Sequence, residues 1–346
     1  MRLSCRLIGA GALCLAALGG WADVPAPDDA IVALSRSLTA AEQRLGPANP
    51  DLLTILAPLA RLQYQAADLA GATASRRRAL QIAIGAFGSG SVRAAEAMTA
   101  LAALYLEQQR YLDAEPLLIA AGNVVTSRLG TGSPEMAAVL AGRAQIALAR
   151  GDRSLAENWA EQAVAIDATD APEEQSRPLC VLGAALAAAG RFDDSERVLR
   201  RALALDRGNA GADGLDAARS LVQLGETYLH WKRYADALPL IEQAARIDQA
   251  RLGATHPLIA DDFFDLGLVY LAMNRAADAR TVLRAAVHLL ERGASRGTPR
   301  LAHIELALAR AEHEMGKEKT AQSLFADARR ILNAAEDEER DRERQT

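Results

Sequence analysis

The feature that most constrains the fold of this 346-residue chain is a repeat of about 42 residues along nearly its whole length. The clearest unit begins at Leu221 and reads LVQLGETYLHWKRYADALPLIEQAARID, and the next begins at Phe263 and reads FFDLGLVYLAMNRAADARTVLRAAVHLL. The same register extends back to Leu59 and forward to Leu308, and every step is 42 residues except one of 39. A period of this size is typical of solenoids, in which each unit packs only on its neighbours. We therefore expect one stack of units rather than two globular domains.

Small residues occupy three positions in every unit, 12 and then 7 residues apart. They are Ala60, Ala102, Ala144, Gly183, Gly225, Gly267 and Ala309; Ala72, Ala114, Ala156, Ser195, Ala237, Ala279 and Ala321; and Ala79, Ala121, Ala163, Ala202, Ala244, Ala286 and Ala328. Two helices cross closely only where neither carries a bulky side chain. Apolar residues between these positions recur at three and four, which is the helical spacing. Each unit is therefore predicted to be a pair of antiparallel helices.

Residues that tolerate a positive φ mark the turns between helices. Gly151, Gly190, Asn274 and Gly316 share one position between the two helices of a unit, where each is expected to end the first helix. The stretch RLGATHP (251–257) combines Gly, His and Pro as a catalytic or metal-binding loop does, but RLGTGSP (128–134) and RLGPANP (44–50) repeat it without His. The interpretation we favour is a joint between units, with Pro beginning the next helix.

The pattern of Leu224-Gly225, Tyr228, Ala237 and Ala244 resembles the tetratricopeptide repeat, and the longer unit with its His-Pro pair resembles the kinesin-light-chain-like subgroup. The resemblance implies an all-α, right-handed superhelical solenoid whose first helices line a concave groove. Leu221 and Phe263 stand where the family has Trp. The subgroup's inner-face Asn is replaced by Ala100, Gly142, Val181, Gln223 and Asp265.

We divide the chain into a signal peptide (1–22), a linker with a half-repeat helix (23–52), seven helix pairs (53–333) and a charged tail (334–346). Arg2 and Arg6 precede an apolar run from Leu7 to Leu18, followed by small residues, which is the pattern of a secretory signal. The alternative is an uncleaved membrane anchor. The tail either binds a basic partner or forms a solvated last helix.

Composition and motifs favour no catalytic, metal or cofactor site. The net charge is −5 and no basic stripe is present, so nucleic acid is not an expected partner. The five His form no paired ligand motif, and nucleophile elbows and phosphate-binding loops are absent from the sequence. Paired carboxylates such as Asp261 and Asp262 are expected at helix starts or on exposed faces. Cys180 is interpreted as a small apolar helix residue, with an intermolecular bridge as the alternative.

Function is therefore expected from a surface. Carrying the family's groove over by position predicts a charged early part, a nearly uncharged middle and a charged late part. The candidates are Arg61, Tyr64, Glu107, Gln145, Leu148, Arg177, Cys180, Ala184, Arg219, Glu226, His230, Asp261 and Arg310. The sequence predicts a non-enzymatic scaffold of a bacterial cell envelope, periplasmic or secreted, that binds a protein or peptide segment. The alternative function is a self-associating structural subunit. The alternative for the alanines of the middle groove is that they reflect the alanine-rich composition alone.

The signal-peptide interpretation predicts that native protein begins at Asp23 or within a few residues of it, because Gly20-Trp21-Ala22 is a plausible cleavage triplet. Intact-mass measurement checks this. Native protein of the soluble cytoplasm that still begins at Met1 would contradict it.

Overall fold

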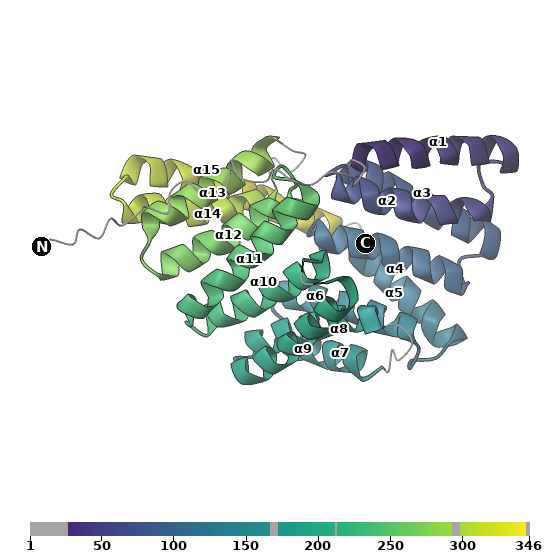
Figure 1. Ribbon diagram of the computed structural model, residues 1–346, viewed down its shortest axis with the longest axis horizontal. Coiled ribbons are helices and arrows are strands. Elements are labelled where there is room, and N and C mark those ends of the chain that lie inside the picture. Colours follow the sequence, from purple (N-terminus) through teal and green to yellow (C-terminus); the bar gives the residue numbers. More distant parts are fainter. Residues whose placement is uncertain (1–26, 167–171, 212, 293–297, 344–346) are drawn as a thin grey trace, which may run out of the picture.

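The computed structural model describes residues 27–166, 172–211, 213–292 and 298–343, and within these ranges the chain is helical apart from its connections. Fifteen α-helices follow one another, with one short 3-10 helix, η1, after the first (Figure 1). Their bounds are α1 Pro27–Leu45, η1 Pro50–Leu52, α2 Leu53–Gln65, α3 Leu69–Phe87, α4 Val92–Glu107, α5 Tyr111–Arg128, α6 Pro134–Ala149, α7 Arg153–Ala165, α8 Pro172–Ala188, α9 Phe192–Ala210, α10 Leu215–His230, α11 Tyr234–Leu252, α12 Leu258–Ala272, α13 Ala276–Arg292, α14 Pro299–Glu314 and α15 Glu318–Glu343.

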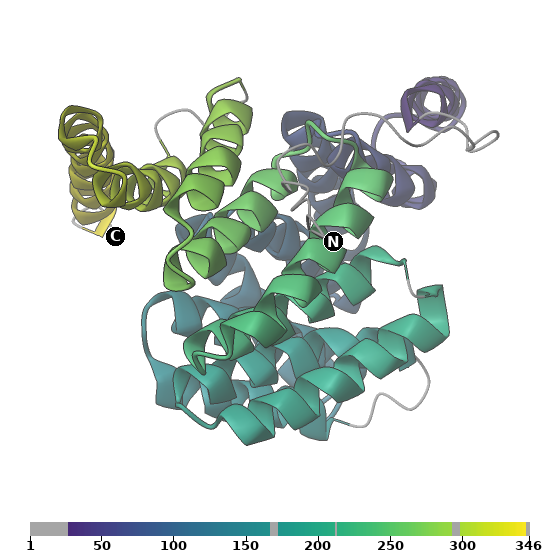
Figure 2. The same cartoon turned by 60° about the vertical axis from the view of Figure 1, so that its left-hand side comes forward.

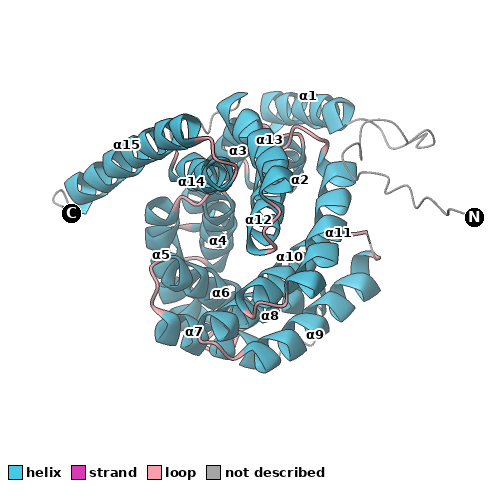
Figure 3. Ribbon diagram, turned by 90° about the vertical axis from the view of Figure 1, so that its left-hand side faces the viewer, coloured by secondary structure: helices cyan, strands magenta, loops and turns pink. Residues whose placement is uncertain are grey.

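Consecutive helices from α2 to α15 pack as antiparallel pairs, and α1 packs on α2 without a pair partner among the described residues. The predicted all-α stack of helix pairs is confirmed. The stack curves: α1–α5 form one arm, α10–α15 form the other, and α6–α9 join them (Figures 1 and 2). Viewed from the side, the helices follow a curved path that brings the two arms near each other (Figure 3).

The small residues lie where the helices touch. All twenty-one are buried, and Ala79, at 8%, has the largest exposed fraction among the alanines and the serine. A Cβ added at Gly225 would lie 2.5 Å from Ile241 Cγ1, and one added at Gly267 would lie 2.5 Å from Leu283 Cδ2. The side chain sixteen residues after the glycine therefore fills the space that a Cβ would need, and the interpretation of these positions as helix contacts is confirmed.

The turn inside each helix pair contains one residue with a left-handed backbone. The four predicted residues have it, with φ of 79° at Gly151, 78° at Gly190, 57° at Asn274 and 75° at Gly316. Three residues at the equivalent position of other units have it as well, namely Ala67 (62°), Gln109 (56°) and Lys232 (61°). In each unit the N–H of the next residue donates to a carbonyl five residues back, as Arg233 does to Tyr228 at 2.8 Å. This pattern ends a helix by a Schellman-type cap, which requires the positive φ.

The stretch RLGATHP is a joint, as predicted. Gly253 ends α11 with a φ of 82°, and Pro257 directly precedes α12. Its His256 is buried, with 1% of its surface exposed.

The predicted signal segment lies outside the described residues. Residues 334–343 of the predicted tail continue α15 as a helix. None of the described helices has the length and apolar character needed to cross a membrane.

Adding one methyl group at a helix contact should destabilise the stack. Gly225→Ala places a Cβ against Ile241, and overpacking of this kind costs about 1–3 kcal/mol. Gly208→Ala is the matched control, because Gly208 lies in α9 with open space around its Cα, and alanine there should stabilise the helix by about 0.5–1 kcal/mol. Chemical denaturation of both variants should give shifts of opposite sign. Two shifts of the same sign would contradict the contact.

Candidate interaction surface

A cavity of about 690 Å³ lies on the inner side of α4, α6 and α8, within the range of volumes seen for ligand pockets. Small residues form much of its wall: Ala100 and Ala103 from α4, and Ala138 and Ala141 from α6. Two of the predicted groove residues, Gln145 and Arg177, also line this cavity. The alanines leave the wall low, and the other lining residues include charged side chains of both signs: Arg76, Arg177, Arg201, Glu96, Glu135 and Asp216.

Two arginines at the cavity are only weakly neutralised. Arg76 of α3 makes no ion pair with a described carboxylate, and burial together with the nearby Arg61 lowers its pKa. The neighbouring Arg219 lowers the pKa of Arg177, with burial as the second cause. Both guanidiniums remain charged at neutral pH, because an arginine is effectively always protonated. The cavity therefore combines alanine walls with two weakly neutralised arginines, among lining side chains that carry both signs of charge.

Glu107, at the end of α4, is shared by two of these cations. Its Oε1 lies 3.8 Å from Arg177 Nη1 and 3.6 Å from Arg219 Nη2, while Arg219 also pairs with Asp216 at 2.6 Å. The three predicted groove residues Glu107, Arg177 and Arg219 come from α4, α8 and α10, so the curvature of the stack brings distant repeats together. All three side chains keep contact with solvent, and pairs of this kind are worth at most about 1 kcal/mol each.

Tyr64 of α2 meets His256 from the joint before α12, 192 residues further along the chain. His256 Nε2 lies 2.8 Å from the carbonyl oxygen of Tyr64, and the two rings meet edge to face with centroids 5.2 Å apart. Tyr64 was predicted to face the groove. His256 was predicted only as part of a joint, and no sequence pattern indicates its contact with the first repeat.

The other predicted groove residues are dispersed. Cys180 is buried, with 4% exposed, and its Sγ lies 3.2 Å from Ser220 Oγ. Burial raises the pKa of the Cys180 thiol to about 11, which fits the interpretation as a small core residue. Leu148 and Ala184 are half-buried and do not line the cavity. Arg61 and His230 are exposed, and Arg310 is exposed and pairs with Glu314 at 2.9 Å.

The late groove holds a group of buried carboxylates. Burial raises the pKa of Glu226 to about 7, with Asp261 nearby as the second cause, and it raises the pKa of Asp265 well above its ordinary value. Arg300 of α14 binds Asp261 and also donates to the carbonyl oxygen of Pro257 at 2.9 Å. Glu226 and Asp261 were predicted groove residues, whereas the role of Asp265 as a buried acid was missed.

The paired carboxylates were expected at helix starts or on exposed faces, and Asp262 lies in the first part of α12 but is buried rather than exposed. Only 2% of Asp262 is exposed, and 3% of Asp248 on α11. Asp262 Oδ2 and Asp248 Oδ1 have no hydrogen-bond partner. Burial raises the pKa of Asp262 to about 8 and that of Asp248 to about 7. Repulsion by the carboxyl of Asp248 is a second cause that raises the pKa of Asp262. Within the described ranges, no three His, Cys, Asp or Glu side chains are placed to hold a metal ion.

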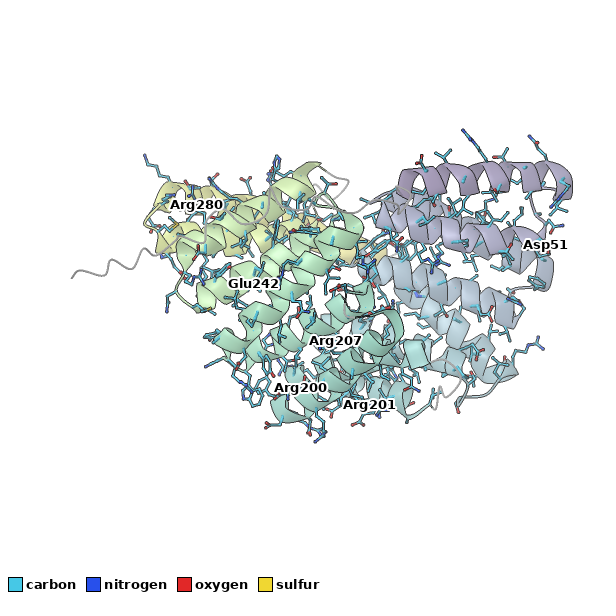
Figure 4. All side chains as sticks on the ribbon, viewed as in Figure 1. Asp51, Arg200, Arg201, Arg207, Glu242 and Arg280 are labelled. Atoms are coloured by element: carbon cyan, nitrogen blue, oxygen red, sulfur yellow. The ribbon has the colours of Figure 1, made fainter. Side chains whose placement is uncertain are left out.

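A second hollow, of about 510 Å³, lies between α9, α10 and α11. Arg200 and Arg207 of α9 line it (Figure 4). Arg200 is already neutralised there, since its Nη2 lies 2.6 Å from Glu196 and donates to the Tyr228 hydroxyl at 3.1 Å.

The model of the tetratricopeptide repeat matches residues 93–169, 174–250 and 232–292, together more than half of the chain. Among solved structures, the kinesin-light-chain TPR-like repeats of Podosopora anserina are 23% identical, with 59% of this chain and 98% of that chain covered and a TM-score of 0.46. Aspartyl phosphate phosphatase F from Bacillus subtilis is 13% identical, with 86% of this chain and 75% of that chain covered and a TM-score of 0.54, which shows a shared fold. No curated protein matches.

The buried acid pair predicts that stability falls as pH rises. An unfolded aspartate ionises near pH 4, whereas folded Asp262 holds its proton to about pH 8. Below about pH 4 both states are protonated, and between pH 4 and 8 only the unfolded state releases the proton, at about 1 kcal/mol per pH unit for one group. Asp262→Asn removes this titration, so its gain in melting temperature over the wild type should grow from pH 5 to pH 8.

The exposed Asp213 provides the control for this experiment. Asp213→Asn should show no such pH-dependent gain. A difference between Asp262→Asn and wild type that stays constant from pH 5 to pH 8 would refute the assignment.

Proposed function

The chain belongs to the tetratricopeptide repeat family, and we propose that it is a non-enzymatic scaffold that binds a segment of a partner protein in the cavity between α4, α6 and α8. The single observation that carries this proposal is that the cavity combines small alanine side chains with a weakly neutralised arginine. Ala100, Ala103, Ala138 and Ala141 leave room for inserted side chains, and Arg76 lies beside them without an ion-pair partner among the described carboxylates.

This combination favours a segment with apolar side chains and a carboxylate close to them. Apolar groups gain free energy by leaving water for the alanine walls. A carboxylate placed near Arg76 or Arg177 would compensate a charge that the free protein leaves only weakly paired, and charge complementarity of this kind also speeds association. Helix or extended backbone both fit a groove of this type.

We further propose that the protein works in a bacterial cell envelope and belongs to the kinesin-light-chain-like subgroup of its family. The location rests on the secretory pattern of residues 1–22, and the subgroup rests on the 42-residue unit and its His-Pro pair. The alternative hypothesis is self-association, because a second copy of the chain is also a protein partner for this surface. Light scattering of the native protein over a range of concentrations distinguishes the scaffold from the self-associating subunit. A monomer at all concentrations disfavours the structural subunit.

The location of the binding surface can be tested with a charge. Ala138 is exposed and lines the cavity, so Ala138→Glu should leave the free protein folded but place a carboxylate in the space expected for the partner's apolar side chains. The new carboxylate would also repel the partner's own carboxylate, and burying like charges together costs several kcal/mol, which predicts a loss of affinity of at least about a hundredfold. The partner is first identified by cross-linking in the native envelope, and its affinity is then measured by calorimetry.

Ala74→Glu is the matched control, because Ala74 is also an exposed alanine but lies on α3, outside the residues that line the cavity. This variant should bind like the wild type. Circular dichroism must show wild-type helix content and melting temperature for both variants. Loss of binding in Ala74→Glu with retention in Ala138→Glu would place the partner on the outer surface instead.

A further inference from the structure

The contact between Tyr64 and His256 joins the two arms of the solenoid. Tyr64 lies in the second-last position of α2, in the first helix pair, and His256 lies in the joint between the fifth and sixth pairs. His256 is buried and Tyr64 is half-buried, and burial is the main cause that raises the pKa of the Tyr64 hydroxyl. Most other contacts in the stack are between neighbouring helices. This contact instead, like the pair of Glu107 with Arg219, spans the two arms and closes a turn of the superhelix.

Both ring nitrogens of His256 are engaged. The carbonyl oxygen of Tyr64 can only accept, so Nε2 must carry a proton and donate to it at 2.8 Å. The backbone N–H of Leu258 donates to Nδ1 at 3.1 Å, so Nδ1 must be unprotonated. The network therefore requires the neutral imidazole with its proton on Nε2. A second proton, on Nδ1, would point at the N–H of Leu258 at the start of α12, where the helix dipole also disfavours a cation.

The charged and titratable groups around His256 come from each element packed near it. Tyr64 belongs to α2, Glu107 to α4 and Arg300 to α14, and Arg300 in turn binds Asp261 of α12. Burial, the largest cause, and Arg300 disfavour an imidazolium, whereas the hydrogen bond to the Tyr64 carbonyl oxygen and Glu107 favour it, and the pKa of His256 is lowered on balance. Glu107 is already shared by Arg177 and Arg219, so its charge is mostly compensated.

We propose that the contact between Tyr64 and His256 is a latch that closes the superhelix across its inner groove, and that protonation of His256 releases this latch. The consequence for binding rests on the function proposed above. Glu107 pairs both with Arg219 of the other arm and with Arg177 at the wall of the central cavity, so separating the arms would change the pairing of charges at this wall.

The direction of the pH effect follows from the surroundings of His256. Burial is the main cause that lowers the pKa of His256 in the closed form, while an exposed histidine has a pKa near 6.5. Closure is therefore fully stabilised above about pH 6.5, and it weakens as the pH falls and the open form takes up the proton. Between pH 7.5 and 5.5 the ratio of open to closed molecules should rise by up to about tenfold.

Small-angle X-ray scattering of the whole chain tests the latch without any partner. The wild type should have a larger radius of gyration at pH 5.5 than at pH 7.5. His256→Ala removes the ring and both hydrogen bonds, and it should be expanded already at pH 7.5. His256→Gln cannot titrate in this range, so its radius should be the same at both pH values. The acid pair Asp248 and Asp262 titrates in wild type and variants alike, and the comparison cancels its effect.

His303→Gln is the control, because His303 is exposed on α14 and should respond to pH as the wild type does. A wild-type radius in His256→Ala at pH 7.5 would overturn the latch. A pH-dependent expansion of His256→Gln as large as that of the wild type would overturn its release by protonation. Both results are independent of the groove variants, so failure of the latch and failure of the binding proposal can be told apart.

Discussion

The structure depends on close contact between helices that carry almost no side chain at the point of crossing. At Gly225 and Gly267 even a methyl group has no room, because Ile241 and Leu283 fill the space from the facing helix. The same crossing recurs in each of the seven helix pairs, so each pair is set against the next by a similar rotation, and the small rotations add up to a curve. The curvature that brings α2 close to the joint before α12 is thus a sum of local contacts between alanines, glycines and the larger residues around them.

Sequence reasoning predicted what is local. The small positions, the left-handed turn residues Gly151 and Asn274, and the joint at Gly253 all follow from patterns within one unit. The left-handed backbone at Ala67, Gln109 and Lys232 was not predicted, because these residues do not prefer it and the neighbouring helices impose it. The surface was predicted less well for a similar reason. Glu107 and Arg219 were identified as groove residues, but their meeting depends on the accumulated curvature, which no single repeat encodes.

The burial of ionisable groups was also beyond the sequence. Asp262 follows Asp261 in the first part of α12, and one residue of rotation on the helix turns its carboxyl into the stack rather than toward solvent. The buried carboxyls and the buried His256 have opposite effects on the stability of the stack as the pH changes. Below neutral pH the carboxyls of Asp248 and Asp262 are protonated and favour the packed stack, whereas His256 loses its preference for the closed form. Acid therefore strengthens the packing between neighbouring repeats at the same time as it weakens the contact between the arms.

This separation matters for a scaffold that must open without unfolding. The contact between the arms consists of side chains from few residues, while the packing within each arm involves whole helices. The free energy gained or lost when His256 takes up one proton is small compared with the packing free energy of a whole repeat, but it is comparable with that of one buried contact. Glu107 links this contact to the cavity, since it pairs with Arg177 at 3.8 Å and with Arg219 of the other arm at 3.6 Å. When the arms separate, the pair of Glu107 with Arg219 is broken as well, because these two side chains belong to different arms. Opening therefore also changes the pairing of charges beside the cavity.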